Sequence, residues 1–211
     1  YSVMVNSGSS ANLISVASLF YKSKNPLKKG DEVIVPTLSW STTYYPLQQY
    51  GLKLRFVDID IDTLNASVQN IIKAYTKKTK LIVAVNILGN PIELSKLRSF
   101  CRSKKIYLME DNCESMGAKI NGKFTGTFGI VNTFSTFFSH HISTIEGGII
   151  LTNDFEIYNL LLALRSHGWT RDLLNNFYLK KNQTKYENYC FALPGYNVRT
   201  TNLNAAIGLE Q

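Results

Sequence analysis

The segment LIVAVNILGNPIELSKLRSFCRSKKIYLMED, residues 81–111, predicts a strand, a helix and a second strand in succession. Residues 81–85 and 106–109 are runs of apolar side chains, which are typical of strands buried on both faces. Residues 93–103, between them, have the apolar spacing of a helix. Strands of this kind that alternate with helices predict a mostly parallel sheet.

The same alternation continues in both directions along the chain. Asn65 has a cap-like position before one of the further helices, and Gly51 stands where another should stop. The predicted fold class is therefore α/β, a three-layer α/β/α domain with a mostly parallel sheet. Further strands are expected at 1–5, 33–35, 54–57, 133–138 and 147–151, and further helices at 42–50, 66–75, 154–166 and from about residue 8, with Leu13, Ile14, Ala17 and Phe20 as its apolar face.

Two segments depart from this alternation. Residues 171–189 show no sustained apolar period and are rich in polar side chains, so we expect a mobile excursion there. The chain stops at residues 208–211 inside an apolar helical pattern. We therefore expect it to be a piece of a longer protein.

Composition favours a globular enzyme. The 211 residues are 45% hydrophobic and 18% charged, and a chain of 23.8 kDa suits one large domain with a sizeable core. No apolar run approaches the roughly 20 residues of a membrane-spanning helix, and residues 1–5 lack the pattern of a secretory signal. Cys101, Cys113 and Cys190 have neither the count nor the spacing of a disulfide framework or a zinc site. The reducing cytoplasm is the expected compartment.

The formal net charge of +8 has two interpretations. Lysines cluster at 22–29, 73–80, 96–105 and 180–185, without an aromatic-interleaved strip or a nucleic-acid-binding motif. We interpret them first as solvated helix faces, and second as a field that attracts an anionic substrate or cofactor. Neither nucleic acid nor a membrane is expected as a partner.

Residues with chemical potential follow the ends of the predicted strands, where ligands of such sheets gather. Gly8 and Ser9 begin a helix, whose free N–H groups and dipole suit a phosphate; the alternative is an ordinary serine-capped helix. Asp111 ends an apolar strand and needs a partner if buried. That partner is a protonated pyridine nitrogen in one interpretation, and a lysine or a helix N-terminus in the other.

Three further features are ambiguous when taken one at a time. Trp40 offers a flat surface to an aromatic cofactor or belongs to the core. His140 and His141 are adjacent on a predicted loop, but no acidic or cysteine set nearby has metal-ligand spacing, so no metal is expected; an ordinary structural histidine is the alternative. The glycines after Glu146 indicate a tight turn with the backbone close to something bound.

Together these motifs resemble the DegT/DnrJ/StrS sugar aminotransferase family of fold-type I pyridoxal phosphate enzymes, over essentially the whole chain. The resemblance implies that residues 1–211 form the cofactor-binding large domain, with an aspartate aminotransferase-like fold, and that the family's N-terminal arm and C-terminal small domain are absent. The segments that carry it are Asn6 to Asn12, Pro36-Thr37 with Trp40, Glu110 to Glu114, Ser135 to Gly148, and Gly195 to Arg199 leading to Ala205 to Gly208.

One departure points to a subclass. Where the family's aminotransferases bind pyridoxal phosphate covalently through a lysine, this chain has His140. His140-His141-Ile142 followed by Glu146-Gly147-Gly148 resembles the family's 3-dehydratase branch. The resemblance implies a pyridoxamine phosphate-dependent enzyme that removes the C3 hydroxyl of a nucleotide-linked 4-keto-6-deoxy sugar in deoxysugar and lipopolysaccharide biosynthesis. His140 would be its catalytic acid and base, and glutamate its amino donor.

The resemblance also implies which residues bind the cofactor. Gly8, Ser9 and Ser135 would hold its phosphate. Asn197 would reach the phosphate bound by a second subunit, so the active form would be a homodimer.

The other end of the cofactor would meet a second group of side chains. The resemblance implies that Asp111 pairs with the pyridine nitrogen and keeps it protonated. Trp40 would stack on the ring, and Glu114 would lie near the cofactor's hydroxyl and amino groups.

Alternatives remain open. Iron–sulfur relatives that act on CDP sugars carry a cysteine pair after the Arg-Asp that matches Arg171-Asp172, whereas Leu173-Leu174 follow here, so we expect an iron–sulfur-free enzyme. An ordinary nucleotide-sugar aminotransferase needs the missing lysine. A non-catalytic pyridoxal phosphate-binding homologue is the third possibility. An unrelated nucleotide-binding module is disfavoured because the chain lacks a Gly-x-Gly-x-x-Gly run.

Overall fold

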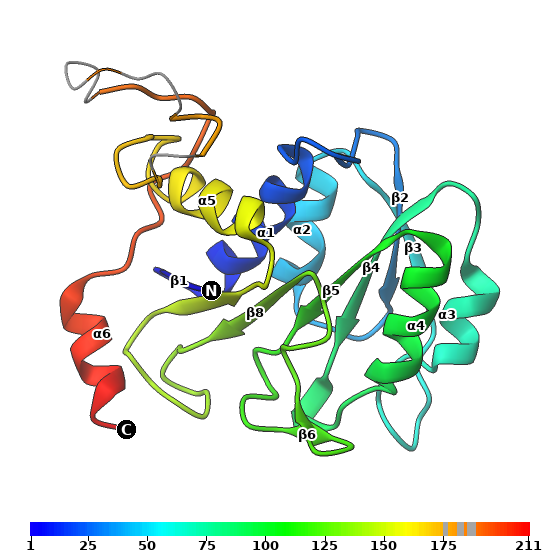
Figure 1. The fold of residues 1–211 in the computed structure, drawn as a ribbon. Coiled ribbons are helices and arrows are strands. Elements are labelled where there is room, and N and C mark those ends of the chain that lie inside the picture. The colour runs from blue at the N-terminus through cyan, green and yellow to red at the C-terminus, as the bar shows by residue number, and fades with distance from the viewer. Residues whose placement is uncertain (175–176, 181–183, 185–188) are drawn as a thin grey trace.

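The computed structural model describes residues 1–174, 177–180, 184 and 189–211, and its helices and strands alternate as the sequence predicts (Figure 1). The elements are β1 Ser2–Val5, α1 Gly8–Phe20, β2 Glu32–Pro36, α2 Ser41–Gln49, β3 Lys53–Val57, α3 Val68–Ala74, β4 Thr79–Val85, the 3-10 turn Ile87–Gly89, α4 Leu94–Lys104, β5 Tyr107–Asp111, β6 Lys119–Ile120, β7 Lys123–Phe124, β8 Val131–Ser135, β9 Gly148–Leu151, α5 Phe155–Leu164 and α6 Asn202–Leu209.

Within the described residues, seven strands form one sheet in the order β1-β9-β8-β5-β4-β2-β3. β9 runs antiparallel to both of its neighbours, and the other pairs are parallel, which confirms the mostly parallel sheet. Register brings Val85 of β4 beside Asp111 of β5, and Asp111 beside Thr133 of β8. The carboxyl ends of the three central strands therefore meet at one edge of the sheet.

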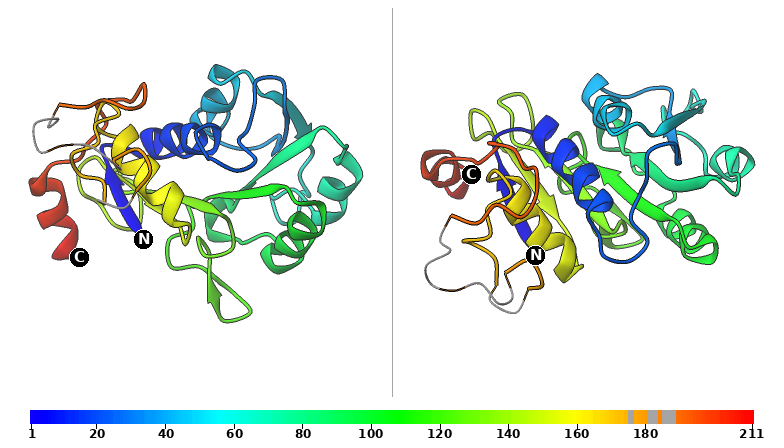
Figure 2. Two further views of the ribbon diagram at one scale, coloured as in Figure 1. Left: turned by 45° about the horizontal axis from the view of Figure 1, so that its top comes forward. Right: turned by 90° about the horizontal axis from the view of Figure 1, so that it is seen from above.

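Helices cover both faces of the sheet, which confirms the three layers. On one face, side chains of α1, α2 and α5 form a core with β1, exemplified by Ile14, Leu47 and Leu160. On the other face, α3 and α4 contribute Ile71 and Leu97 to a second core. Figure 2 shows α1 and α5 side by side. Each fully buried aliphatic side chain contributes about 1.5–3 kcal/mol to folding.

The helix α1 is buried on more than the expected face. Leu13 and Phe20 are only partly buried, whereas Ser15, Val16 and Ser18 are buried. The physical reason is that α1 packs against the sheet, α2 and α5 together, so burial is not confined to one stripe. The four residues of the predicted apolar face are buried or partly buried, and burial extends beyond them to other sides of the helix.

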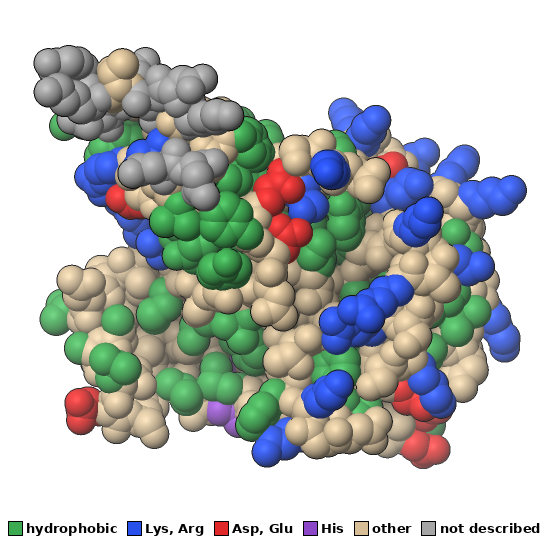
Figure 3. Space-filling view, viewed as in Figure 1, with side chains coloured by type: hydrophobic (Ala, Val, Ile, Leu, Met, Phe, Trp, Pro, Cys, Tyr) green, Lys and Arg blue, Asp and Glu red, His purple; other side chains and the backbone are tan. Residues whose placement is uncertain are grey.

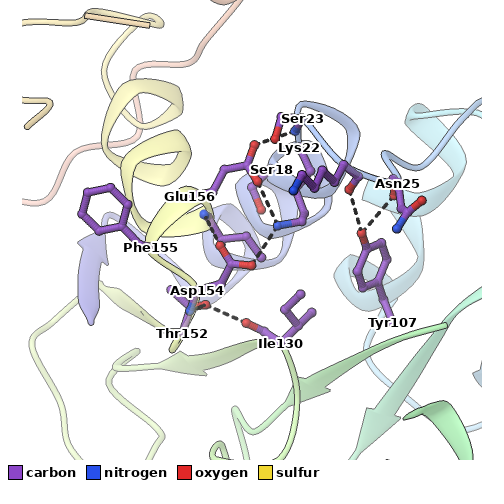
Figure 4. A network of polar contacts seen from close by, with 12 residues as sticks. Ser18, Lys22, Ser23, Asn25, Tyr107, Ile130, Thr152, Asp154, Phe155 and Glu156 are labelled. Carbon is purple, nitrogen blue, oxygen red and sulfur yellow. Dashed lines mark hydrogen bonds and ion pairs between the residues drawn. The ribbon is translucent and has the colours of Figure 1, made fainter. Parts of the chain in front are cut away.

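A polar cluster joins the end of α1 to the start of α5 (Figure 4). The Lys22 ammonium lies 2.8 Å from a carboxylate oxygen of Asp154 and 3.1 Å from one of Glu156. Asp154 also caps α5 by accepting the Ile157 N–H. Burial alone would raise the pKa of Asp154, but the hydrogen bonds from Lys22 and Ile157 lower the pKa overall.

Glu110 is a second buried carboxylate, on β5 next to Asp111. Its oxygens accept the backbone N–H groups of Gly126 at 2.8 Å, Phe128 at 2.7 Å and Gly129 at 2.8 Å. Burial raises the pKa of Glu110, and these three donors offset only part of the rise. Glu110 thus ties the loop before β8 to the central strand.

Several local predictions differ from the structure. Ser67, not Asn65, caps α3, because its hydroxyl accepts the Asn70 N–H. Asn65 is buried and instead joins two loops by accepting the Ile87 N–H at 3.2 Å and donating to the Asn90 carbonyl at 2.8 Å. These partners are distant in sequence, so a local pattern does not reveal them.

Element ends differ as well. β8 ends at Ser135, so residues 136–138 leave the predicted strand and enter a loop. α5 ends at Leu164, two residues before the predicted end. The hairpin of β6 and β7, which the sequence analysis missed, turns at Asn121 and Gly122 with φ of +51° and +76°. The stop at Gly51 is confirmed, because α2 ends at Gln49.

The excursion expected at 171–189 includes residues 175–176, 181–183 and 185–188, which lie outside the described residues. Of the described ones, Leu173 and Phe177 are buried and pack into the core beside α5. In the lysine clusters, Lys73, Lys96 and Lys104 are exposed. Figure 3 shows Lys and Arg side chains spread over the side of α3 and α4, as solvated faces predict. No helix in the described part of the chain is long and apolar enough to cross a membrane.

Candidate functional site

A cavity of about 570 Å³ opens at the carboxyl ends of the central strands. It lies between the start of α1, the start of α2, the end of β5 and the loop after β8. Of the eight residues predicted for the site, seven line it: Gly8, Ser9, Trp40, Asp111, Glu114, Ser135 and His140.

The start of α1 forms part of the cavity wall. Ser7 caps the helix by accepting the Ser10 N–H at 3.0 Å, so the serine-capped alternative is also realised. The N–H groups of Gly8 and Ser9 belong to the first turn, where no helical carbonyl accepts them. A Cβ on Gly8 would lie 2.7 Å from the Cβ of Ser135, so only glycine allows this close approach of α1 and β8. N–H groups and a hydroxyl thus converge where an anion fits.

The cavity wall also contains a buried carboxylate. Asp111 is 5% exposed; its Oδ2 accepts hydrogen bonds from Asn12 Nδ2 at 2.9 Å and Thr43 Oγ1 at 2.8 Å. Its Oδ1 accepts the Cys113 N–H at 3.2 Å. Among the described residues no cationic side chain forms an ion pair with Asp111, so the lysine expected as one alternative is not found. The neutral donors leave a negative charge facing the cavity.

The Cys113 thiol also lines the cavity and was not among the predicted residues. Burial, and then the negative charge of Asp111, raise the pKa of this thiol well above its ordinary value. The thiol is therefore neutral at physiological pH and a poor nucleophile. The thiol packs beside Gly8, and its Sγ lies 3.2 Å from the point where a Cβ on that glycine would lie.

Trp40 lies at the N-cap position of α2, and its side chain is 74% exposed. The interpretation of Trp40 as a core residue was therefore wrong. An exposed indole at the wall of a cavity offers its flat face to a ring-shaped ligand.

Glu114 follows β5 and is fixed by the loop after β4. Its Oε2 accepts the Leu88 N–H at 2.8 Å. Leu88 has a φ of +50°, in the left-handed region, and this conformation shapes the loop that holds the carboxylate. Glu114 is thereby oriented on the cavity wall next to Asp111.

The two adjacent histidines lie in different surroundings. His140 is partly buried and lines the cavity. Its backbone N–H donates to the Phe137 carbonyl at 2.9 Å, and its ring meets the Phe137 ring edge to face. His141 is exposed and is not among the lining residues. At Gly148 the backbone passes close to the loop before α1, since a Cβ there would lie 2.2 Å from the Ser7 carbonyl oxygen. The expected approach of this glycine pair to a bound group stays a prediction.

Asn197 is the one predicted residue that lies outside the cavity. It is exposed, in a segment that pairs with Ser166 after α5. The next residue, Val198, accepts the Asn6 N–H at 2.9 Å, which ties this segment to the loop before α1. The contact of Asn197 with a second subunit stays a prediction.

Sequence reasoning missed Asn12, Thr43, Cys113 and Phe137. Asn12, Cys113 and Phe137 stood inside motifs that had been singled out, whereas Thr43 carried no local signal. Within the described residues no cluster of three or more His, Cys, Asp or Glu side chains could hold a metal ion.

The cavity wall combines N–H groups and hydroxyls at the start of α1 with a buried carboxylate, an indole and an imidazole. This combination suits a ligand that carries an anionic group and a cationic ring. Sheet order and site together define an α/β domain with a cavity at the carboxyl ends of its parallel strands, where such domains bind their ligands.

Comparison with known proteins gives the family. Residues 1–211 match the profile of the DegT/DnrJ/EryC1/StrS aminotransferase family, and the chain belongs to this family. It is 55% identical over 100% of its length to a GDP-4-keto-6-deoxy-D-mannose 3-dehydratase of Yersinia pseudotuberculosis, and it covers 54% of that protein. The chain thus spans about half the length of this curated relative.

Two solved structures show the fold. The Escherichia coli GDP-4-keto-6-deoxy-D-mannose-3-dehydratase with bound hydrated PLP is 54% identical, with a TM-score of 0.95 over 100% of this chain and 55% of that one. An aminotransferase of Psychrobacter cryohalolentis is 25% identical, with a TM-score of 0.88 over 100% of this chain and 51% of that one. The predicted α/β fold of the aminotransferase type is confirmed.

Proposed function

We propose that the protein is a pyridoxamine phosphate-dependent dehydratase, which removes the C3 hydroxyl of a nucleotide-linked 4-keto-6-deoxy sugar. The observation that carries the proposal is that His140 lines the cavity and no lysine is among the lining residues that the structure describes. An aminotransferase needs a lysine amine there. The relatives that are named 3-dehydratases support the same activity.

The residues present fit this cofactor. Gly8, Ser9 and Ser135 would hold its phosphate, because unsatisfied N–H groups and a hydroxyl converge at the start of α1. Asp111 would pair with a protonated ring nitrogen, which supplies the cation that this buried carboxylate lacks in the described part of the chain.

The remaining wall of the site fits the ring and its substituents. Trp40 would cover one face of the ring, and Glu114 would approach its hydroxyl and amino groups. When bound, the cofactor supplies a primary amine that condenses with the C4 ketone and a protonated ring that accepts electrons.

His140 carries the proton transfers in this proposal. We assign to its imidazole the removal of a proton from the C4′ carbon of the cofactor. The same imidazole returns a proton to the C3 hydroxyl of the sugar, which leaves as water. An imidazole suits both steps because it gains and loses a proton near neutral pH.

The domain assignment, the amino donor, the oligomeric state and the location are further parts of the proposal. Residues 1–211 correspond to the cofactor-binding large domain of an enzyme about twice as long, as the covered share of its relatives suggests. Glutamate would regenerate the amine form of the cofactor, and Asn197 would serve the site of a second subunit in a homodimer. Free Cys101, Cys113 and Cys190 support a cytoplasmic location.

The experiment is a product analysis. The full-length protein is incubated with glutamate, pyridoxal phosphate and a panel of GDP- and CDP-4-keto-6-deoxyhexoses, and the products are identified by mass spectrometry. A dehydratase forms a 4-keto-3-deoxy sugar that lacks one oxygen atom of the substrate, because the C3 hydroxyl leaves as water while the amine form of the cofactor is oxidised to the aldehyde and its nitrogen is released as ammonia. An amino sugar as the sole product would show an aminotransferase instead, and bound cofactor without turnover would show a non-catalytic homologue.

A further inference from the structure

The carboxylate of Asp111 has its two oxygens in different surroundings. Oδ2 accepts two short hydrogen bonds, from Asn12 Nδ2 at 2.9 Å and from Thr43 Oγ1 at 2.8 Å. Oδ1 accepts one longer bond, from the Cys113 N–H at 3.2 Å. Because each carboxylate oxygen has two lone pairs, Oδ1 keeps acceptor capacity that Oδ2 lacks.

The donors of Oδ2 are themselves oriented by neighbours. Thr133 Oγ1 donates to Asn12 Oδ1 at 2.7 Å, so the NH₂ group of that amide must face Asp111. The hydroxyl of Thr43 has one proton and donates it to Asp111. The Ser39 hydroxyl, 2.8 Å from Thr43 Oγ1, must therefore be the donor in that pair.

The network joins four elements of the fold. Asn12 belongs to α1, Thr43 to α2, Asp111 to β5 and Thr133 to β8. All four side chains are buried. Thr43 is not among the residues that line the cavity, so it reaches a ligand only through Asp111.

We propose that Thr43, together with Asn12, is a positioning residue that holds Oδ2 of Asp111 and so presents Oδ1 to a protonated nitrogen of a heterocyclic ligand. The inference rests on the proposed function, because it concerns the ring nitrogen of the same cofactor. It adds a source of selectivity: the site distinguishes a ring that carries a charged N–H group from one that does not.

The test uses Thr43→Val, which keeps the shape of the side chain and removes the donor. Thr43→Ser keeps the hydroxyl and is the rescue variant. Thr125→Val is the matched control, because Thr125 is equally buried and donates to the Ser115 carbonyl at 2.8 Å, without contact to Asp111. Affinity is measured in the full-length protein by absorbance titration, with pyridoxal phosphate and with its 1-deaza analogue, in which a carbon replaces the ring nitrogen.

We expect Thr43→Val to weaken the binding of pyridoxal phosphate by about tenfold, and to change the binding of the deaza analogue by less than about twofold. The absorption spectrum of bound pyridoxal phosphate should also shift, because the ring proton is held less firmly. Thr43→Ser and Thr125→Val should bind both compounds as the unchanged protein does.

The outcomes separate this inference from the proposed function. Equal losses for both compounds, or no loss for either, would overturn the positioning role of Thr43 while the cofactor assignment stands. If the unchanged protein binds pyridoxal phosphate no better than the deaza analogue, Asp111 does not recognise a ring nitrogen, and the inference fails. If the unchanged protein binds neither compound, the proposed function fails and the inference fails with it.

Discussion

His140 and His141 are neighbours in the chain, yet only His140 lines the cavity. Their replacement therefore separates a catalytic histidine from an exposed one. His140→Asn keeps a polar group of similar size and removes the proton transfer, so cofactor affinity should persist while turnover falls by about 10²–10⁴.

His141→Asn is the matched control and should keep most of the activity. The measurement is the rate of 3-deoxy sugar formation, together with a cofactor titration of each variant. Loss of activity in His141→Asn alone would show that the sequence register places the wrong histidine in the site.

A second prediction at the residue scale concerns how the cofactor is attached. Because the cavity presents an imidazole and no lysine among its described lining residues, pyridoxal phosphate should bind without a covalent bond to the protein. After borohydride treatment, intact-mass measurement should show the mass of the protein alone. His140→Lys should gain the mass of the cofactor and lose dehydration.

The control is His140→Asn, which should remain unlabelled. A stable cofactor adduct on the unchanged protein would contradict the prediction. It would also revive the aminotransferase alternative.

How far the sequence reveals the site is visible at this scale. Gly8, Asp111 and His140 stood in motifs and line the cavity as expected. Thr43 carried no signal, because its partner Asp111 lies 68 positions further along the chain and only the tertiary fold brings the start of α2 to the end of β5. The sequence also could not decide whether Trp40 lies in the core or faces a ligand, since an indole suits both positions equally.

At the scale of elements, the junction of α1 and α5 depends on a cation between two carboxylates. Lys22→Met should lower the free energy of unfolding at pH 7 by about 1–2 kcal/mol, because Asp154 and Glu156 would lose their partner in a largely buried position. Urea unfolding measures this difference. Lys96→Met is the control, since the exposed pair of Lys96 with Glu93 should contribute less than about 1 kcal/mol.

The pH dependence of the stability of Lys22→Met follows from the pKa shifts of Asp154 and Glu156. Burial would raise the pKa values of Asp154 and Glu156, but their hydrogen bonds lower both overall. A lowered carboxyl pKa stabilises the fold above the ordinary values of 3.8 and 4.5, and the stabilisation is lost as pH falls through the lowered values. The deficit of Lys22→Met should therefore shrink as the pH falls below the ordinary carboxyl values of 3.8 and 4.5. If the loss of stability in Lys22→Met does not change with pH, the loss comes from the packing of the Lys22 side chain and not from its charge.

Burial would lower the pKa of Lys22, but its two carboxylate partners raise it overall. Its contribution is thus present below 10.5 and is lost only as pH rises through the raised value.

Elements with strong periodicity were predictable, and those fixed by distant contacts were not. The runs that became β2, β4 and β5 are apolar because both faces of the sheet are covered. β8 looked longer than it is, because Phe137 and Phe138 continue its apolar pattern beyond Ser135, where the loop of the site begins. The hairpin at Asn121 and Gly122 was detectable from its turn residues alone.

For the whole molecule, the prediction is that a second subunit completes the site through Asn197. Asn197 is exposed and outside the cavity of its own chain. If it contacts the phosphate bound by the partner subunit, Asn197→Ala should weaken cofactor affinity by roughly tenfold or more, since a hydrogen bond to a charged group contributes about 1.5–3 kcal/mol.

Asn153→Ala, at another exposed asparagine, is the control and should bind the cofactor normally. Sedimentation of the full-length protein, measured beside the cofactor titration, gives the oligomeric state. A monomer that holds the cofactor tightly would contradict the role of Asn197.

Glu110 and Asp111 make β5 intolerant of any change in length. Neighbouring side chains on a strand point to opposite faces, and here each carboxylate has its own set of donors: backbone N–H groups of the loop for Glu110, Asn12 and Thr43 for Asp111. Deletion of one residue upstream in β5 would exchange the two faces, leaving both sets of donors with the wrong partner. Natural homologues should therefore carry insertions and deletions at the exposed turn of Asn121 and Gly122, and none between Tyr107 and Asp111.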